Sequence, residues 1–493
     1  GACERAKGYF DRVNDAVYDL LTNENEISRD LISFYAEKHC VCPFEMGLDV
    51  TLWADAIICD YNYAFDPNVY LRRFFQNEKQ NDYVFLVDEA HNLVDRAREM
   101  YSAILYKDHF LEVKKLIKEK SVKLAKQLDR CNKDLLMLKR DCDEFEVVDN
   151  VDGFCMNLMR LMTEYETFLQ ENHVMEGKEE ILRLYFDVRH FLNIFENLDD
   201  KYTIYTDYDE GDRFRIKLQC MDPSNNLYNC MVRGRSSVLF SATFLPINYY
   251  KEQLGGQKED YAVYAPTSFL PENRLIMIGN DVSTKYSRRN EMEYRKIADY
   301  IKDFTSAKIG NYMVFFPSYQ MLMQIAEILE DEIEGIAVQS SSMTEEEREL
   351  FLEDFIPNPQ KSRIAFCVMG GIFSEGIDLK SNRLIGAIIV GTGLPMVCNE
   401  RELFRGYFDE RNHRGFEYAY LYQGMNKVLQ SAGRVIRTQE DRGVILLLDE
   451  RFTGNQYARL FPREWYPNVI VNRATMRSTL DEFWGKHELD QRS

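Results

Sequence analysis

The sequence predicts an α/β protein with two parallel-sheet domains, the first of which is interrupted by a helical insertion. Three observations support this prediction. Short apolar runs bounded by polar turns, such as Tyr83–Val87, are typical of buried parallel strands. Between residues 101 and 219, apolar residues recur at three- and four-residue steps, which is the spacing of amphipathic helices. After Pro266, apolar runs alternate with helical patterns, which predicts a second parallel sheet.

The composition is that of a soluble protein with several domains. The chain has 493 residues, whereas single hydrophobic cores stop growing at about 250–300 residues. Its longest apolar stretch, Leu384–Val397, contains glycines and is shorter than the roughly 20 residues of a membrane-spanning helix. The net charge of −20 argues against a protein that coats nucleic acid through its whole surface, but it is compatible with a local basic groove.

The start of the chain bears on location and completeness. No signal peptide is present, so we expect a reducing, cytoplasmic environment in which the 11 cysteines do not form a disulfide framework. The chain begins Gly1-Ala2-Cys3, without an initiator methionine. Either a trimmed terminus or a fragment of a longer protein explains this start, and the motifs described below favour the fragment.

Strand and helix patterns place the first domain and its insertion. Two strands are expected in the first hundred residues, at Ala56–Cys59 and Tyr83–Val87. The apolar residues from Val113 to Leu138 predict one amphipathic helix or a pair of helices, and further helices are expected around 156–169 and 180–198. Most of this apolar stripe is interpreted as core packing.

A hairpin is predicted at the end of the insertion. Tyr202–Thr206 and Phe214–Leu218 flank the turn residues Asp209–Asp212. Strand signals resume at residues 237–240. Residues 101–219 should therefore be inserted between strands of one α/β layer.

The second domain shows the alternation of an α/β fold. Tyr312–Phe316 predicts a strand, and Gln320–Glu332 predicts the helix that follows it. Thr344 and Glu347 have the spacing of a capping box at the start of another helix. Further strands are expected at Ile364–Val368, Leu384–Val390 and Val444–Leu448.

The tetrapeptide Asp88-Glu89-Ala90-His91 directly follows a predicted strand. The carboxyl ends of parallel strands are where α/β sheets place ligand-handling residues. Phosphoryl transfer needs a metal ion and a carboxylate that orients the attacking water. Asp88 is therefore expected to hold Mg²⁺ and Glu89 to act on the water. A helix N-terminus with favourable acidic residues is the alternative.

A second motif, Gln430-x-x-Gly433-Arg434-x-x-Arg437, precedes a predicted strand. We expect the two guanidinium groups, three positions apart, to lie on one helix face. Arginine suits phosphate binding because its charge is permanent and its planar fork matches phosphate oxygens. The pair could act as arginine fingers from the second domain. A solvated arginine face, the alternative, explains neither Gly433 nor Gln430.

Three weaker motifs lie between these two. Ser241-Ala242-Thr243 ends a predicted strand. Ser374-Glu375-Gly376-Ile377-Asp378 follows a strand and the flexible pair Gly370-Gly371. In Phe315-Phe316-Pro317-Ser318-Tyr319 a strand turns into a helix and offers a hydroxyl and an aromatic ring to nucleic acid. Each motif taken alone is more often ordinary loop or core structure.

Taken in order, these motifs resemble those of the XPD/DinG-like group of superfamily-two helicases. The resemblance covers almost the whole chain and extends to Cys42–Glu45 and Asp60–Tyr63. It implies two RecA-like motor domains, with the helical insertion in the position of the family's arch. It also implies an ATP-dependent DNA helicase that uses Mg²⁺, moves 5′→3′ on single-stranded DNA and acts in DNA repair or replication. A bacterial DinG-like member is the nearest look-alike.

The resemblance also assigns roles to residues. The expected catalytic residues are Asp88, Glu89, His91, Gln430, Arg434 and Arg437. The expected coupling residues are Ser241, Ala242, Thr243, Glu375, Gly376 and Asp378, and Ser318 and Tyr319 are expected to bind nucleic acid.

The phosphate-gripping loop of this family has no counterpart in the sequence. No G-K-[ST] tripeptide occurs, because Lys178 and Lys486, which follow glycines, precede Glu and His. In the family this loop lies upstream of the iron–sulfur region, which corresponds to a position before Gly1. We therefore expect a first domain with a short sheet and an uncovered apolar edge, and an inactive chain.

The family also carries a [4Fe–4S] cluster held by four cysteine thiolates. Cys3 and Cys42 match family ligand positions, and Cys40 is a nearby extra cysteine. Without the resemblance, these residues would be interpreted as ordinary free thiols. We expect the cluster in the full-length protein but not in this fragment.

The expected domain boundaries follow from these assignments. They are 1–42 for the remnant of the iron–sulfur region, 43–100 and 220–265 for the first motor domain, 101–219 for the arch-like insertion, and 266–493 for the second motor domain. A nucleotide-independent single-strand-binding or scaffold protein is the alternative function. Reading the coding DNA upstream of Gly1 would discriminate the two, because a fragment of a helicase predicts a phosphate loop there.

Overall fold

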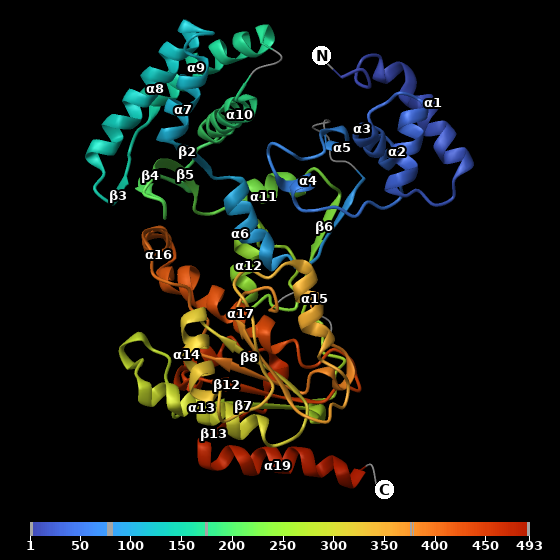
Figure 1. Ribbon diagram of the computed structural model, residues 1–493, viewed down its shortest axis with the longest axis vertical. Coiled ribbons are helices and arrows are strands. Elements are labelled where there is room, and N and C mark those ends of the chain that lie inside the picture. Colours follow the sequence, from blue (N-terminus) through green and yellow to red (C-terminus); the bar gives the residue numbers. More distant parts are fainter. Residues whose placement is uncertain (1–2, 76–81, 173–175, 375–376, 378, 491–493) are drawn as a thin grey trace. The chain divides into compact units, whose positions relative to one another are not determined.

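The computed structural model describes residues 3–75, 82–172, 176–374, 377 and 379–490 (Figure 1). The chain divides into two compact units. Unit 1 comprises Gly1–Tyr83 and Asp95–Arg235, and unit 2 comprises Val84–Val94 and Ser236–Ser493. Within the described ranges, none of the helices combines the length and hydrophobicity that a bilayer crossing requires.

The N-terminal part of unit 1 is a small helical bundle. It is formed by α1 (Tyr9–Asn23), α2 (Arg29–Lys38) and α3 (Pro43–Val50), whose apolar faces share one core. The core residues are Tyr9, Val13, Ala16, Val17, Leu20, Tyr35, Ala36, Val41 and Met46. Three short helices follow: η1 (Thr51–Trp53), α4 (Asn62–Phe65) and α5 (Arg72–Phe75).

The expected strand at Ala56–Cys59 does not form. This segment has no regular secondary structure, and the side chain of Ile58 is fully exposed. A strand needs a neighbouring strand for its backbone hydrogen bonds, and none of the described segments pairs with these residues. An apolar run alone was therefore an insufficient signal.

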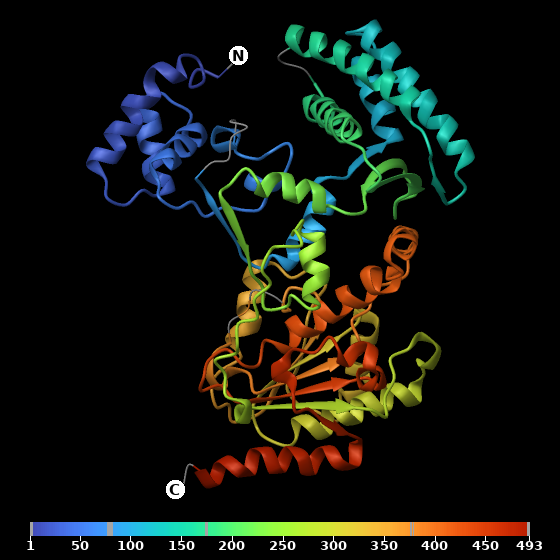
Figure 2. The same cartoon turned by 180° about the vertical axis from the view of Figure 1, so that it is seen from behind.

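The helical segment of unit 1 consists of long helices and an antiparallel sheet (Figures 1 and 2). The helices are α7 (Lys107–Ile117), α8 (Val122–Asp141), α9 (Asp152–Glu171) and α10 (Lys178–Phe195). The strands are β2 (Ala103–Tyr106), β3 (Phe145–Val147), β4 (Tyr202–Tyr208) and β5 (Phe214–Cys220), in the order β2-β5-β4-β3. The predicted hairpin is confirmed, because β4 pairs antiparallel with β5. Helix α11 (Ser224–Met231) follows.

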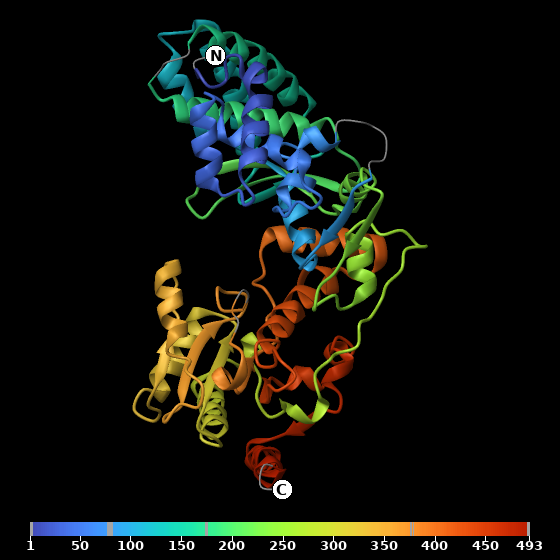
Figure 3. The ribbon, with the colours of Figure 1, turned by 90° about the vertical axis from the view of Figure 1, so that its right-hand side faces the viewer.

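Among the described residues, the first sheet of unit 2 has two strands. β1 (Val84–Val87) pairs in parallel with β6 (Ser236–Leu239), and the two run side by side in Figure 3. The side chains of Leu86 and Val238 are 70% and 51% exposed. Among the described residues this sheet is short, as expected, and apolar side chains on it are exposed. Helix α6 (His91–Met100) follows β1 and continues into unit 1.

The main sheet of unit 2 has seven parallel strands in the order β13-β7-β12-β11-β8-β10-β9. The strands are β7 (Arg274–Gly279), β8 (Asn311–Phe316), β9 (Ile336–Val338), β10 (Arg363–Val368), β11 (Gly386–Val390), β12 (Gly443–Leu448) and β13 (Val469–Val471). The four strands expected from the sequence in this region are confirmed. β7, β9 and β13 were not predicted.

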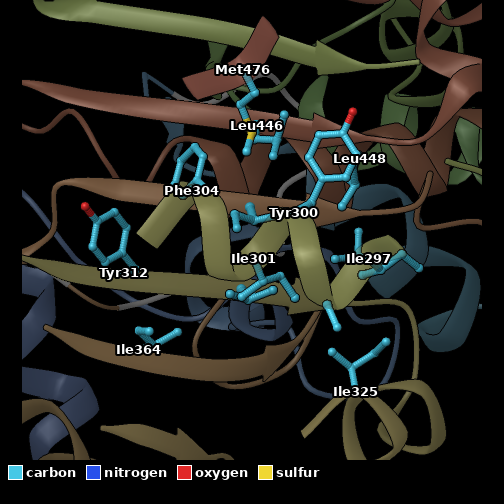
Figure 4. Close-up of a cluster of buried hydrophobic side chains, with 14 of the residues drawn as sticks. Ile297, Tyr300, Ile301, Phe304, Tyr312, Ile325, Ile364, Leu446, Leu448 and Met476 are labelled. Atoms are coloured by element: carbon cyan, nitrogen blue, oxygen red, sulfur yellow. The ribbon is translucent and has the colours of Figure 1, made fainter. Parts of the chain in front are cut away.

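The hydrophobic core of this sheet lies beneath α13 (Glu291–Thr305), α14 (Tyr319–Leu329) and α19 (Arg473–Asp490). Figure 4 shows side chains of α13, such as Tyr300 and Phe304, against Leu446 and Leu448 of β12. The strands β8, β11 and β12 are buried on both faces. Such strands show no alternation of polar and apolar residues in the sequence.

The remaining elements of unit 2 connect these strands. They are α12 (Ile247–Gln253), η2 (Pro271–Asn273), η3 (Tyr286–Arg288), α15 (Glu345–Glu353), η4 (Ser381–Arg383), α16 (Asn399–Asn412), the π-helical turn η5 (Glu417–Leu421), α17 (Tyr422–Ala432), η6 (Glu450–Thr453), α18 (Asn455–Ala458) and η7 (Arg463–Trp465). The predicted capping box of α15 is confirmed, because Glu347 N–H donates to Thr344 Oγ1 (3.2 Å) and Thr344 N–H donates to the Glu347 carboxylate (2.8 Å).

Candidate active site

The two-stranded sheet of unit 2 brings two of the predicted motifs together. Asp88–His91 follows β1, and Ser241–Thr243 follows its partner β6. A hydrogen bond from Ala90 N–H to the carbonyl oxygen of Phe240 (3.1 Å) joins the two segments beyond the strands. The parallel pairing therefore places both motifs at the same edge of the sheet.

Glu89 has an unusual backbone conformation. Its φ angle is +44°, in the left-handed region that non-glycine residues rarely adopt. The Asp88 carboxylate accepts a hydrogen bond from Glu89 N–H (2.7 Å). The side chain of Glu89 is 56% exposed, and that of Asp88 is also exposed. Backbone strain of this kind is concentrated at functional sites, where the surrounding structure holds it in place.

His91 is the centre of a buried hydrogen-bond network. Its Nδ1 atom lies 2.7 Å from Ser241 Oγ, and its Nε2 atom lies 2.7 Å from Gln430 Nε2. His91 and Gln430 are only 5% and 9% exposed. An amide nitrogen can only donate, so His91 Nε2 accepts, and the imidazole proton is on Nδ1, which donates to Ser241 Oγ.

The network ends at the Glu89 carboxylate. Ser241 Oγ also accepts from Thr243 N–H (3.1 Å) and donates to Glu89 Oε2 (3.4 Å). The same carboxylate oxygen is 3.2 Å from His91 Nδ1. A directed chain of donors therefore runs from Gln430 through His91 and Ser241 to Glu89. It connects three motifs that were identified separately in the sequence.

The two arginines do not lie on a helix face, so this expectation was wrong. Helix α17 ends at Ala432, and the chain turns at Gly433 before Arg434 and Arg437. The two guanidinium groups nevertheless converge, because Arg434 Nη1 (3.1 Å) and Arg437 Nη2 (3.0 Å) both donate to the carbonyl oxygen of Ile377. The loop geometry, rather than helical spacing, brings the two charges together.

The carbonyl that accepts both arginines belongs to the predicted Ser374–Asp378 motif. Three expected coupling residues of this motif, Glu375, Gly376 and Asp378, lie outside the described residues. Ser374 is fully buried, and its Oγ accepts from Gly370 N–H (2.9 Å) and donates to the Val368 carbonyl (3.3 Å). The motif is thus attached to the end of β10, whereas sequence analysis had not predicted a role for the Ile377 carbonyl.

The expected nucleic-acid-binding residues have structural partners. Ser318 is the N-cap of α14, and its Oγ accepts from Met321 N–H (3.3 Å). The Tyr319 hydroxyl accepts from Gln339 Nε2 (2.8 Å), and Gln339 Oε1 accepts from Val368 N–H (3.0 Å). Both Ser318 and Tyr319 are partly exposed. Their contact with nucleic acid stays a prediction.

The cysteines provide at most part of a cluster site. Cys3 and Cys40 are exposed and Cys42 is partly exposed at the start of α3. Among the residues that the structure describes, no group of three or more His, Cys, Asp or Glu side chains could hold a metal ion. Because a [4Fe–4S] cluster needs four thiolates, Cys3 and Cys42 do not fit the group by themselves. A Mg²⁺ ion differs, since it takes one or two carboxylates and phosphate oxygens, and exposed Asp88 fits that requirement.

Sequence analysis also missed Asp441. This carboxylate lies two residues before β12, is 2% exposed and accepts hydrogen bonds from the segment that carries Arg437. The sequence feature that could have revealed Asp441 is an acidic residue next to a strand made only of apolar residues. Carboxylates are almost never fully buried unless their hydrogen bonds are satisfied by specific partners.

Two protein families match the chain. The family DEAD_2 matches residues 3–110, and a helicase C-terminal domain matches residues 301–468. The first match includes Asp88–His91, and the second includes Gln430–Arg437.

Several curated relatives are helicases. The ATP-dependent DNA helicase CHL1 of Debaryomyces hansenii is 23% identical, over 84% of this chain and 58% of that protein. The XPD/RAD3 helicase subunit of general transcription and DNA repair factor IIH of Saccharomyces cerevisiae is 24% identical, over 87% and 67%. The ATP-dependent DNA helicase XPD of Sulfolobus acidocaldarius is 24% identical, over 83% and 72%. The chain thus spans about three fifths of the length of the CHL1 relative.

Solved structures share the fold. An XPD helicase structure has a TM-score of 0.58 at 20% identity, covering 91% of this chain and 79% of that chain. Xpd4 of S. tokodaii has a TM-score of 0.56 at 15% identity, covering 83% and 81%. The chain therefore contains a DEAD_2 domain and a helicase C-terminal domain, and it shares the fold of the XPD structures. These domains and the XPD and CHL1 relatives support a place in the XPD/DinG-like group of superfamily-two helicases.

Proposed function

We propose that this chain is the motor part of an ATP-dependent DNA helicase that moves 5′→3′ on single-stranded DNA. The observation that carries the proposal is the hydrogen-bond chain from Gln430 through His91 and Ser241 to Glu89. A structural scaffold does not require a strained, exposed carboxylate at the end of a buried polar relay. A motor that couples hydrolysis to movement requires such a connection between its motifs.

The carboxylates of Asp88 and Glu89 have separate roles in this proposal. Asp88 would hold Mg²⁺, which, when bound, neutralises charge on the transferring phosphate. Glu89 orients the attacking water, and the donor Ser241, itself held by His91, fixes the direction of its carboxylate. The preorganised donors reduce the reorganisation that this carboxylate would otherwise need at the moment of reaction.

The arginines supply positive charge for the phosphates of ATP. Arg434 and Arg437 already share one acceptor, the Ile377 carbonyl. Their permanent charge and planar forks suit phosphate oxygens, which can replace or join that carbonyl as acceptors. Because Ile377 lies within the Ser374–Asp378 motif, a change at the arginines would move that motif. Ser241 to Thr243, Glu375, Gly376 and Asp378 are proposed to transmit this change to the DNA, and Ser318 and Tyr319 are proposed to contact the strand.

The described residues do not supply the phosphate-binding loop or a complete set of ligands for the iron–sulfur cluster. No G-K-[ST] loop occurs in the 493 residues, so we propose that the chain by itself does not hydrolyse ATP. We propose Cys3 and Cys42 as two of the four thiolates of a cluster in the full-length gene product, and we derive no step through it. A cytoplasmic location and a role in DNA repair or replication are likewise proposed.

The proposal is tested on the full-length gene product, defined from the coding DNA on both sides of this segment. Phosphate release is measured with and without single-stranded DNA, and strand separation is measured on duplexes with a 5′ or a 3′ overhang. Stimulated release and separation only from the 5′ overhang are expected. Separation from the 3′ overhang would overturn the direction. Tight single-strand binding that ATP does not change, with no phosphate release, would overturn the motor and favour a nucleotide-independent binding protein.

A further inference from the structure

The buried carboxylate of Asp441 binds two loops that meet at the arginine pair. Asp441 Oδ2 accepts from the backbone N–H groups of Arg437 and Thr438, both at 2.7 Å. Asp441 Oδ1 accepts from Thr438 Oγ1 (2.9 Å) and from the backbone N–H of Ser381 (2.9 Å). With 2% exposure and four donors, the carboxylate has little access to water and needs its protein partners.

The two loops that Asp441 binds are those that meet in the contact between the arginine pair and the Ile377 carbonyl. One contains Arg437 and Thr438, and the other contains Ser381, four residues after Ile377. Arg434 and Arg437 donate across the same junction to the Ile377 carbonyl. Backbone hydrogen bonds to Asp441 and side-chain hydrogen bonds to Ile377 therefore fasten one junction at two points.

The backbone at this junction is held in a conformation that needs support. Ser381 has a φ angle of +61°, in the left-handed region, although it is not a glycine. The Ser381 N–H group donates to Asp441 Oδ1. The oxygens of an ionised carboxylate only accept hydrogen bonds. Here each of the two oxygens accepts from two donors, which satisfies the carboxylate. An asparagine of the same shape would place an amide NH₂ against N–H or O–H donors at one of the two oxygen positions.

We propose that Asp441 is the positioning residue of the arginine pair, which fixes Arg437, and with it Arg434, against the Ile377 loop. This inference rests on the proposed function, because it assigns the arginines to phosphate contact. Asp441 itself does not touch the substrate. A guanidinium displaced by about 1 Å at a phosphoryl-transfer site costs on the order of a hundredfold in rate. Asp441→Asn should therefore lower kcat for DNA-stimulated hydrolysis by about ten- to a hundredfold, with a KM for ATP changed less than about threefold.

The first experiment needs no activity. Amide hydrogen exchange is measured on the 493-residue chain and on Asp441→Asn. The amides of Arg437 and Thr438 should exchange at least about tenfold faster in the variant, whereas those of Leu446 and Leu447 in β12 should not change. Unchanged exchange at Arg437 and Thr438 would overturn the proposal. If the variant fails to fold, Thr438→Val, which removes only the hydroxyl donor, should show the same local effect on a smaller scale.

The second experiment is a double-mutant cycle in the full-length gene product. If Asp441 acts through the arginine, then Asp441→Asn should lower kcat in the wild-type background and have no further effect in Arg437→Ala. The matched control is Asp449→Asn, at the other end of β12, because Asp449 is fully buried and accepts from Thr284 and Arg451 instead. Its effect on kcat should multiply with that of Arg437→Ala. If the effects of Asp441→Asn and Arg437→Ala on kcat multiplied, the role of Asp441 would be merely structural and the proposal would be overturned.

The two experiments separate this inference from the proposed function. A wild-type protein without DNA-stimulated hydrolysis would contradict the proposed function, and the exchange experiment would still decide whether Asp441 holds the loop. Stimulated hydrolysis together with an Asp441→Asn variant of full kcat would leave the motor in place and overturn only the positioning role.

Discussion

The Nε2 atoms of His91 and Gln430 lie 2.7 Å apart, although 339 positions separate the two residues in the chain. Gln430 donates to His91 Nε2, and the Nδ1–H group of His91 donates to Ser241 Oγ. Neither residue faces solvent, so neither can exchange this partner for water without a cost. The two strongest motifs of the sequence are therefore joined by a contact in which Gln430 donates and His91 accepts.

Gln430→Leu should break this connection. The variant keeps the size of the side chain but removes the donor that Gln430 provides to the buried His91 Nε2, which costs about 1–3 kcal/mol of folding free energy. We also expect DNA-stimulated phosphate release by the full-length gene product to fall at least about tenfold, since one oriented polar group contributes on that scale. Both are measured, by denaturant unfolding of the chain and by phosphate release.

Gln219→Leu is the matched control for this prediction. Gln219 is 3% exposed, lies in unit 1 and donates to the neighbouring carbonyl of Cys220 (3.0 Å), and its amide oxygen has no hydrogen-bond partner among the described residues. Gln219→Leu should therefore change stability less than Gln430→Leu, and it should change the stimulated rate per folded molecule by no more than about twofold. Equal losses of activity in the two variants would show that stability, rather than the contact with His91, explains the effect.

Glu89→Gln should separate nucleotide binding from hydrolysis. The carboxamide keeps the shape of the side chain but cannot act on water as the carboxylate does, so the full-length gene product should bind ATP and lose DNA-stimulated phosphate release. Binding is measured with a fluorescent nucleotide and release with a phosphate sensor. The exposed Glu349→Gln in α15 is the control and should behave as wild type. Wild-type turnover by Glu89→Gln would refute the role of Glu89 in orienting water.

The sequence was informative where chemistry is local. Asp88–His91 and Ser241–Thr243 were placed after strands, and parallel pairing of those strands brings them to one edge. The capping box and the β4–β5 hairpin also depend on near neighbours in the chain. The contact between His91 and Gln430 could not be predicted in this way, because it depends on how distant segments pack.

The wrong predictions have equally physical causes. Ala56–Cys59 is apolar, but strand formation depends on a partner that the described residues do not provide. Arg434 and Arg437 have helical spacing, but α17 has already ended at Ala432. The missed strand β7 (Arg274–Gly279) is as long as the predicted strands and lies between β12 and β13 in the sheet. Its burial comes from neighbours that are far away in sequence.

The acid stability of unit 2 should depend on Asp449. Burial by itself raises the pKa of this carboxyl, but the hydrogen bonds and charge of Arg451 and the N–H of Thr284 outweigh it, so its pKa lies below the ordinary value of 3.8. A lowered pKa means that the ionised form stabilises the fold above the unfolded-state pKa, and that this contribution is lost as the pH falls through the folded-state pKa. Asp449→Asn removes the contribution at every pH.

Denaturant unfolding of the 493-residue chain and of Asp449→Asn between about pH 3 and pH 7 tests this prediction. The difference in unfolding free energy should be constant above about pH 5 and should shrink below about pH 4. Thr284→Val, which removes one hydroxyl donor to Asp449, should show a smaller difference of the same sign. A difference that does not change with pH would contradict the assignment.

The 493-residue chain by itself should neither hydrolyse ATP nor unwind duplexes. ATP affinity in such motors comes largely from backbone amides and one lysine around the β- and γ-phosphates, and no G-K-[ST] loop occurs in the sequence. The carboxylates of Asp88 and Glu89 would repel the triphosphate unless Mg²⁺ bridged them. The seven-stranded sheet of unit 2 has its own core and should still fold.

Two measurements on the same chain check this last prediction. Phosphate release with and without single-stranded DNA should stay at background. Fluorescence anisotropy of a labelled oligonucleotide should show weak binding that decreases steeply between about 50 and 200 mM salt, because any remaining contact depends on charge. DNA-stimulated release that disappears in Glu89→Gln would show that the phosphate loop is dispensable, since the remaining motifs would then bind and hydrolyse ATP without it.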